Sequence, residues 1–289
     1  MKTTPITPKR AAVLLAALSV LLLTAICPMK AGAYVLESPH ILDLTADAMG
    51  RLPDLRVEQK LLIYPQNPDV FPTAHDETAI YIAPHRFRSD IVSDRIHRTH
   101  LEVGSRSLTV IDGRMAMARD PFDLYQRLLR SRTRTRLMRT LNALGIETAI
   151  SSLGRVDDAV VFVLGARYPD ESVSQLAVDK GTFLPVRLLL TNGTFEDPEQ
   201  RLEIYYRDWR SLQDGRFPAQ VLFFINGRLA REIRVVQMVV NPSIPAGTMD
   251  LEALKASIAA ARADTPRMQK QEAVDAVQQG VQDFRKKFE

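Results

Sequence analysis

Most of the chain beyond residue 50 carries the alternation of apolar and polar positions that is typical of β-strands. In segment 55–63, Leu55, Val57 and Leu61 alternate with polar neighbours. A period of two places such residues on one face of a strand. The same pattern predicts strands over 78–83, 86–92, 97–103, 107–111, 159–166, 172–179, 183–191, 201–209, 217–225 and 228–240.

Short turns separate these segments. Asp112-Gly113, Lys180-Gly181, Asn192-Gly193, Asp214-Gly215 and Asn226-Gly227 have the composition of tight turns. Such connections join antiparallel neighbours, because parallel strands need long crossovers. Roughly ten strands are therefore expected in one antiparallel sheet, and open sheets of that size curl. We expect a mainly β fold with helices, in which the sheet forms a half-barrel.

Three stretches have helical spacing instead. Ser38-Pro39 begins an N-terminal helix that Gly50 ends. Apolar residues from Phe122 to Leu144 predict one helix or two short ones, inserted between the two sets of strands and ended by Gly145. Segments 251–261 and 274–288 predict a helical tail. The central insert is the large amphipathic element available to cover the concave face of the sheet, as a lid or a plug.

Several strands are apolar on both faces. Segments 160–164 and 221–225 contain only apolar residues, and so does the run of leucines at 188–190. A sheet with one face in water would alternate, so these segments must be covered on both sides or face a hydrophobic cavity.

The first 33 residues have the order of a secretory signal peptide. Lys2, Lys9 and Arg10 precede an apolar run over 11–27, and the small residues 31–33 form a cleavage site. An uncleaved membrane anchor is the alternative. We therefore expect an exported, periplasmic protein with a half-barrel domain over 34–250 and a helical tail over 251–289.

The leader and the rest of the chain differ in charge and in cysteine content. The whole chain has 38 basic and 34 acidic residues, but four of the basic residues lie in the leader, which has no acid. The remaining chain is formally neutral, so its net charge gives no reason to expect nucleic acid as a partner. The one cysteine, Cys27, also lies in the leader, so a hydrophobic core without disulfides must hold the exported chain together.

Signals of catalysis are poor in this sequence, although a triad that forms only in space would not show in it. No G-x-S-x-G elbow and no glycine-rich phosphate loop is present. His97 and His100 are three residues apart, which on a strand points them to opposite faces. We expect no enzymatic activity, no cofactor and no metal site.

A run of arginines occupies the central insert. Arg127, Arg130, Arg132, Arg134, Arg136 and Arg139 occur without an acidic residue among them. Spacing by two distributes them around a helix, which suits a solvated segment. The alternative is contact with anionic phospholipid or with an acidic partner, because clustered cations near a membrane gain about 1 kcal/mol each.

The order of elements resembles that of the periplasmic outer-membrane lipoprotein carriers (LolA/LolB-like). The segment APHRFRSDI (83–91) is similar to the family's strand start, and VIDGRMAMARDP (110–121) to the hairpin that leads into its lid. LAVDKGTFLPVRLLL (176–190) and YRDWRSLQDGRFPAQV (206–221) resemble late strands of lipoprotein-sorting relatives. The resemblance covers roughly residues 36–254.

This resemblance implies a hydrophobic cavity between sheet and lid that holds acyl chains without catalysis. The cargo would be a lipid or an acylated lipoprotein, the chain a monomer, and an inner- or outer-membrane protein a further partner. A non-enzymatic sensor or interaction module of the cell envelope is the alternative. From alternation, the cavity candidates are Phe87, Ile91, Leu101, Phe162, Leu164, Leu188, Tyr205, Trp209 and Phe223. The candidates for lid or membrane contact are Leu128, Leu141, Arg130, Arg132, Arg134 and Arg136.

Overall fold

The computed structural model describes residues 35–67, 69–94, 96–116, 120–191 and 200–260. The predicted signal peptide (1–33) and the second tail helix (274–288) lie outside the described residues. Everything below concerns the unit that begins at Leu36.

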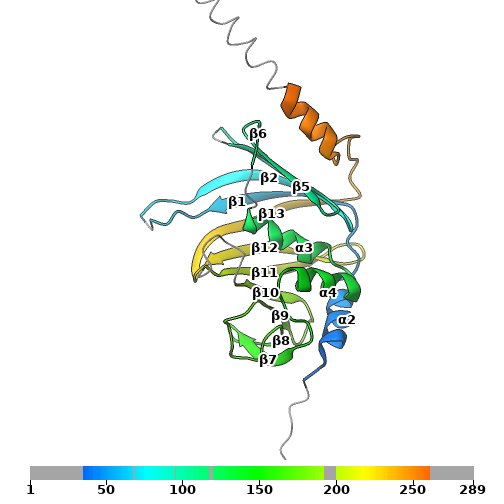
Figure 1. Cartoon of the computed structure of the whole chain (residues 1–289), viewed down its shortest axis with the longest axis vertical. Helices are drawn as coiled ribbons and strands as arrows, with labels where there is room; N and C mark the ends of the chain where they lie inside the picture. Colours follow the sequence, from blue (N-terminus) through cyan, green and yellow to red (C-terminus); the bar gives the residue numbers. More distant parts are fainter. Residues whose placement is uncertain (1–34, 68, 95, 117–119, 192–199, 261–289) are drawn as a thin grey trace, which may run out of the picture. The chain divides into compact units, whose positions relative to one another are not determined.

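Thirteen antiparallel strands form one curled, unclosed sheet (Figure 1). Their spatial order is β6-β5-β4-β3-β2-β1-β13-β12-β11-β10-β9-β8-β7, so that β1 and β13 join the two halves at the centre. The bounds are β1 Leu55–Ile63, β2 Thr73–Ile82, β3 Arg86–Val92, β4 His97–Val103, β5 Arg106–Ile111, β6 Arg114–Met115, β7 Ser151–Val156, β8 Ala159–Leu164, β9 Gln175–Asp179, β10 Pro185–Leu190, β11 Leu202–Ser211, β12 Arg216–Ile225 and β13 Arg228–Val240.

The predicted fold class is confirmed, but the count of roughly ten strands was too low. Two edge strands were missed. β6 has two residues, too few for alternation to show, and β7 reads SSLGRV, in which polar residues and a glycine hide the pattern. β2 also begins five residues before the predicted 78–83, because its polar first half pairs with β1.

The helices have the predicted places. α2 (Ser38–Met49) has proline in its first turn and ends at Gly50, and a further helix spans 251–260. The central insert (residues 121–143) consists of η1 Pro121–Leu124, α3 Tyr125–Arg130 and α4 Arg134–Ala143. Ser131 is extended and the Thr133 side chain caps α4, so the insert is broken rather than one long helix.

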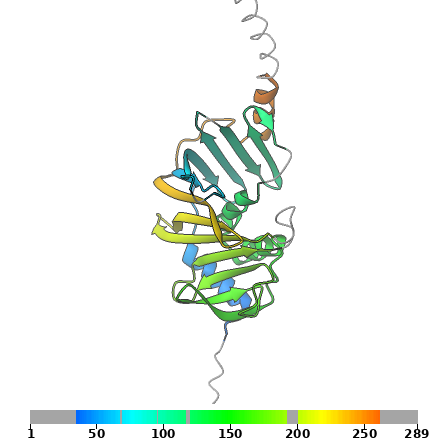
Figure 2. The same ribbon diagram turned by 90° about the vertical axis from the view of Figure 1, so that its left-hand side faces the viewer.

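The main hydrophobic core lies between the concave face of the sheet and the helices (Figures 1 and 2). α2 contributes Ile41 and Leu42 to it, and the insert contributes its leucines. The same core takes in residues from both halves of the sheet, including Leu55 of β1 and Leu188 of β10. The concave face is thus covered by the chain itself.

The convex face is covered in places. Leu254 and Ile258 of helix 251–260 lie near Thr99 of β4 and Val110 of β5, and Arg88 of β3 donates a hydrogen bond of 2.8 Å to the Thr248 carbonyl. On the other half of the sheet, a second small core of buried residues comprises Val156, Val161, Val163, Ala166 and Ala177. Most side chains of the strands that are apolar on both faces are therefore buried, although Val160 of β8 is exposed.

The three leucines at 188–190 are divided between the two faces of the sheet. Leu188 and Leu190 belong to the concave core, whereas Leu189 is fully buried outside that core. Alternation along β10 places Leu189 on the convex face.

α2 is held against the sheet by two glycines. Gly50 has a left-handed φ of 63°, and a Cβ at Gly215 would stand 2.3 Å from the Arg51 carbonyl oxygen. We expect Gly215→Ala to lower the free energy of unfolding by about 1–3 kcal/mol, because the added methyl must push this crossing apart.

Urea unfolding of the chain from residue 34 onward measures the effect. Gly181→Ala is the matched control, because the nearest atom to its added Cβ would be 3.5 Å away. Equal stabilities of the two variants would contradict a close α2–sheet crossing.

Candidate functional site

The candidate site is the concave face of the sheet beneath the insert. Seven of the nine predicted cavity residues contribute to its core: Phe87, Ile91, Phe162, Leu164, Leu188, Trp209 and Phe223. They do not meet at one point. Phe87 and Ile91 lie on β3, whereas Phe162 and Leu164 lie on β8, at the far end of the sheet.

Leu101 and Tyr205 lie on the opposite, convex face. Leu101 neighbours Glu102, whose side chain contacts the insert, so Leu101 points away from it. Tyr205 packs against the second small core and against Phe224, with ring centroids 5.4 Å apart. Neither residue therefore lines the space beneath the insert.

Regular alternation would place Trp209 on the same face as Tyr205, but the structure places it on the other face. The left-handed φ of 51° at Asp208 interrupts the strand's regular alternation, and Trp209 packs on Tyr206, with centroids 6.4 Å apart. Its indole N–H donates to the Pro185 carbonyl at 3.1 Å.

Aromatic rings fill the centre of the site. Tyr125, the first residue of α3, lies edge-on to Phe87 and to Phe223, with ring centroids 6.4 and 5.6 Å away. Its hydroxyl accepts a hydrogen bond from Tyr81 at 3.2 Å, and its carbonyl accepts one from Tyr206 at 3.1 Å. These contacts fix the start of α3 on the sheet.

The expected open cavity is not present at this centre. The space lined by Ile91, Phe122 and Phe223 measures about 20 Å³, which is of the order of one water molecule. A drug-sized ligand needs about 300 Å³ or more. An acyl chain could therefore enter here only if the insert moved.

Over β1–β4 the concave face carries buried polar side chains among its apolar ones, which alternation did not predict, and we call this part the polar half. On β2 and β3, buried Glu77 accepts hydrogen bonds from Ser89 and from Gln59, the latter at 2.8 Å. Burial raises the pKa of Glu77 in spite of these donors. A carboxyl group placed so deep favours the neutral form.

Ion pairs attach the insert to this polar half. Arg98 of β4 contacts Asp123 of η1 at 2.6 Å. From β13, Arg231 contacts Asp120 at 2.8 Å, and its guanidinium lies 3.8 Å from the centre of the Phe122 ring. Charged contacts therefore reach the beginning of the insert from both sides.

Glu102 of β4 makes the third attachment. It pairs with Arg127 at 3.3 Å and with Arg130, and it accepts a hydrogen bond from Gln126 at 3.2 Å. Burial on its own would raise the pKa of Glu102, but Arg130 and Arg127 outweigh it and hold the pKa below its ordinary value. The carboxylate is therefore charged where it is nine-tenths buried.

The predicted lid residues divide into several groups. Leu128 and Leu141 are fully buried in the core. Arg132 donates to the carbonyls of Leu129 and Met49, both at 2.6 Å, and Arg134 pairs with Asp43 of α2 at 2.9 Å. Arg130 is buried on Glu102, and Arg136 makes no side-chain hydrogen bond or ion pair within the described chain. Most of these arginines hold the insert in place.

The described residues give no sign of a metal centre or a membrane helix. Among residues 35–260, apart from the gaps noted above, no group of three or more His, Cys, Asp or Glu side chains could hold a metal ion. None of the helices in that part of the chain has both the length and the apolar content needed to cross a membrane.

Comparison with solved structures identifies the fold. A domain of Vibrio parahaemolyticus assigned to outer membrane lipoprotein sorting matches 75% of this chain and 97% of its own, with a TM-score of 0.50 and 7% identity. A LolA superfamily protein from Nitrosomonas europaea and a DUF1329 family protein from Desulfovibrio piger each give a TM-score of 0.48 and 12% identity; they match 75% and 76% of this chain, and 99% and 100% of their own.

No family model matches the sequence, and neither does any curated protein. The similarity to the Vibrio domain concerns the fold. The chain has the fold of that lipoprotein-sorting domain.

The loss of unfolding free energy on removing the Glu102 charge should show how strongly the insert is attached to the sheet. In Glu102→Gln, buried Arg130 loses its carboxylate, and breaking such a pair costs about 3–5 kcal/mol. Because the Glu102 pKa is lower in the folded state, its stabilisation is present above the ordinary glutamate range and is lost as the pH falls through the folded pKa. The deficit of the variant should therefore shrink in acid.

Urea unfolding between pH 3 and 7 follows this difference. Glu58→Gln is the control, because the Arg56–Glu58 pair is exposed and such pairs contribute about 1 kcal/mol or less. A deficit at Glu102 that stays constant across this range would contradict the assigned charge.

Proposed function

We propose that the protein is a non-catalytic carrier of acyl chains, and that the insert is the lid over its binding site. The observation that carries the proposal is the coverage of a large apolar concave face by short helices rather than by further strands. The fold shared with a lipoprotein-sorting domain supports the same function. The cargo would be a lipid or the acylated end of a lipoprotein.

The free energy gained by burying an acyl chain is similar to that gained by burying the leucines of the insert. Four leucines of the insert, Leu128, Leu129, Leu137 and Leu141, are fully buried, and each contributes about 1.5–3 kcal/mol by burial. A chain of a dozen methylenes gains about 10 kcal/mol on leaving water. An acyl chain could therefore take the place of the insert's leucines against the sheet, and a reverse exchange would release it.

The polar attachments determine where along the sheet the cargo would lie. Arg98, Arg231 and Glu102 lie on the sheet. Arg98 and Glu102 pair with charged residues of the insert, and Arg231 pairs with Asp120, the residue that caps its first helix. When the insert lifts, water can solvate these groups. An apolar chain cannot, so the cargo would lie along the apolar strands β8–β12 and leave the polar half to the insert.

The leader gives the proposed location. A chain exported by residues 1–33 would meet acylated cargo in the periplasm, between the two membranes. There a carrier needs a covered site, because an exposed acyl chain would return to a bilayer.

Native mass spectrometry of the exported chain, purified without detergent, tests the carrier function first. We expect adducts of acyl-lipid mass that disappear on denaturation. We also expect a dansylated undecanoic acid to bind with one-to-one stoichiometry and to increase hydrogen exchange over residues 121–143. A bare mass together with no uptake of the probe would overturn the proposal and favour the interaction module.

Loosening the insert should speed loading. Arg231→Ala removes the ion pair with Asp120 and the contact with the Phe122 ring, each worth about 1 kcal/mol or less. We expect stopped-flow uptake of the dansylated acid to be about tenfold faster, since 1.4 kcal/mol corresponds to a factor of ten.

Arg234→Ala is the matched control. Arg234 lies on the same strand and pairs with Glu232 at 2.5 Å, away from the insert. Uptake by the two variants at the same rate would show that Arg231 does not hold the lid.

A further inference from the structure

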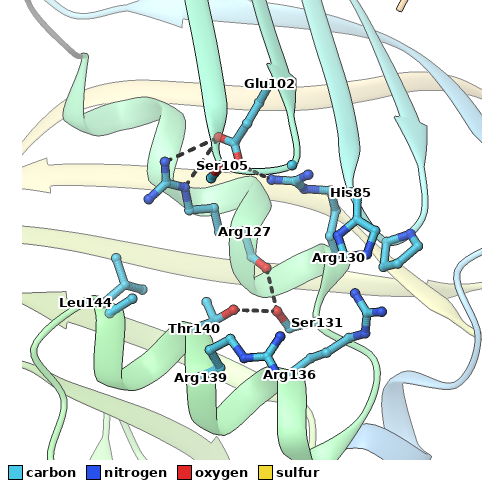
Figure 3. A pocket seen from close by; sticks show the side chains of 13 residues that line it. His85, Glu102, Ser105, Arg127, Arg130, Ser131, Arg136, Arg139, Thr140 and Leu144 are labelled. Atoms are coloured by element: carbon cyan, nitrogen blue, oxygen red, sulfur yellow. Dashed lines mark hydrogen bonds and ion pairs between the residues drawn. The ribbon is translucent and has the colours of Figure 1, made fainter.

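A basic pocket lies between the insert and two turns of the sheet (Figure 3). Its volume is about 380 Å³. His85 lines it from the β2–β3 turn and Ser105 from the β4–β5 turn, while α3 and α4 supply the opposite wall. The pocket therefore lies beside the insert rather than beneath it.

Positive charge exceeds negative charge in this pocket. Arg127, Arg130, Arg136 and Arg139 line it, with Glu102 as the single carboxylate. Figure 3 shows Arg127 and Arg130 directed to Glu102, and Arg136 and Arg139 on neighbouring turns of α4. In the described part of the chain, the side chains of Arg136 and Arg139 have no hydrogen-bond or ion-pair partner.

A buried donor in the wall also lacks a partner. Arg130 is 6% exposed, and its Nε makes no hydrogen bond within the described residues. Buried N–H groups are nearly always paired. The unpaired Nε of this pocket-lining arginine is closed off from solvent, so a bound acceptor could satisfy it after a small shift of the side chain.

The two hydroxyl groups that α3–α4 contribute to the wall, those of Ser131 and Thr140, are already ordered. Ser131 donates to the Arg127 carbonyl at 2.9 Å, so the 2.7 Å contact between Ser131 and Thr140 places the donated hydrogen on Thr140. Neither hydroxyl has a hydrogen left to donate. Recognition in this pocket would therefore come from guanidinium groups, which bind oxyanions in a bidentate way, and from the Ser105 hydroxyl.

An adjacent hollow is less selective for anions. It measures about 610 Å³ and shares Arg130 and Arg136, but Asp54 and Asp214 also line it. Four arginines face two carboxylates there, against four arginines and one carboxylate in the smaller pocket. The smaller pocket therefore has the stronger attraction for a compact anion.

We infer that the smaller pocket binds a phosphate group, with Arg136 and Arg139 as its principal ligands and Arg130 Nε as a buried donor. Leu144 lines the pocket and also packs against the main core. A phosphorylated amphiphile could therefore place its head here and its chain under the insert. The choice of an amphiphile rests on the proposed function, whereas phosphate binding does not.

Isothermal titration with three probes tests the inference: dodecyl phosphate, dodecyl maltoside below its micelle concentration, and inorganic phosphate. We expect dodecyl phosphate to bind more tightly than the uncharged detergent of equal chain length, and its affinity to fall with added salt. The double variant Arg136→Gln/Arg139→Gln should weaken dodecyl phosphate at least about tenfold and leave dodecyl maltoside unchanged.

Arg134→Gln is the control, because Arg134 lies on the same helix and pairs with Asp43 outside the pocket. Loss of dodecyl phosphate affinity in this control to the same extent, or equal binding of the charged and uncharged probes, would overturn the inference and leave the carrier function intact. Binding of inorganic phosphate with no uptake of either amphiphile would support the pocket and contradict the carrier. Thermal unfolding of each variant confirms that it is folded.

Discussion

The structure depends on the need to bury the concave face of a sheet that does not close. A closed barrel removes its inner face from water by itself, whereas an open sheet of thirteen strands must be covered from outside. Here the cover is α2 and the insert, whose leucines meet both halves of the sheet. Because β1 and β13 join these halves at the centre, the first and last strands share one core.

This cover is attached by two kinds of interaction with different responses to water. Leucines such as Leu128 and Leu141 are held by burial, which an acyl chain could replace. The contacts of Arg98 with Asp123 and of Arg231 with Asp120 are charged, and water can replace them. The insert is attached both by buried leucines and by ion pairs. It can leave the sheet only where an apolar chain replaces the leucines and water solvates the charges, as at the boundary between a lipid and water.

The fold could be predicted from the sequence because its signals are local. Alternation gave most strands, turn residues gave the antiparallel order, and Ser38-Pro39 and Gly50 gave α2 its ends. β7 was not predicted because SSLGRV has no alternation. It forms a strand because it pairs with β8. Local patterns cannot show such pairing.

The site was less predictable, because it depends on which face a strand presents. Alternation separates two faces but does not say which is concave, so Leu101 and Tyr205 were assigned to the wrong one. The partners of the charged residues are also far apart in sequence. Glu102 and Arg130 are 28 residues apart, and Asp120 and Arg231 are 111 apart. Composition shows the charges, and only the fold shows which are paired.

The arginines of the insert illustrate this limit. Their spacing suggested a uniformly solvated segment, yet the break at Ser131 gives the two helices different orientations. The arginines of α3 turn toward Glu102 and neutralise a buried carboxylate, whereas Arg136 and Arg139 of α4 stay outside that pairing. One run of like charges thus has two roles. Its first part fastens the insert to the sheet, and its second part leaves positive charge beside the place where the insert would open.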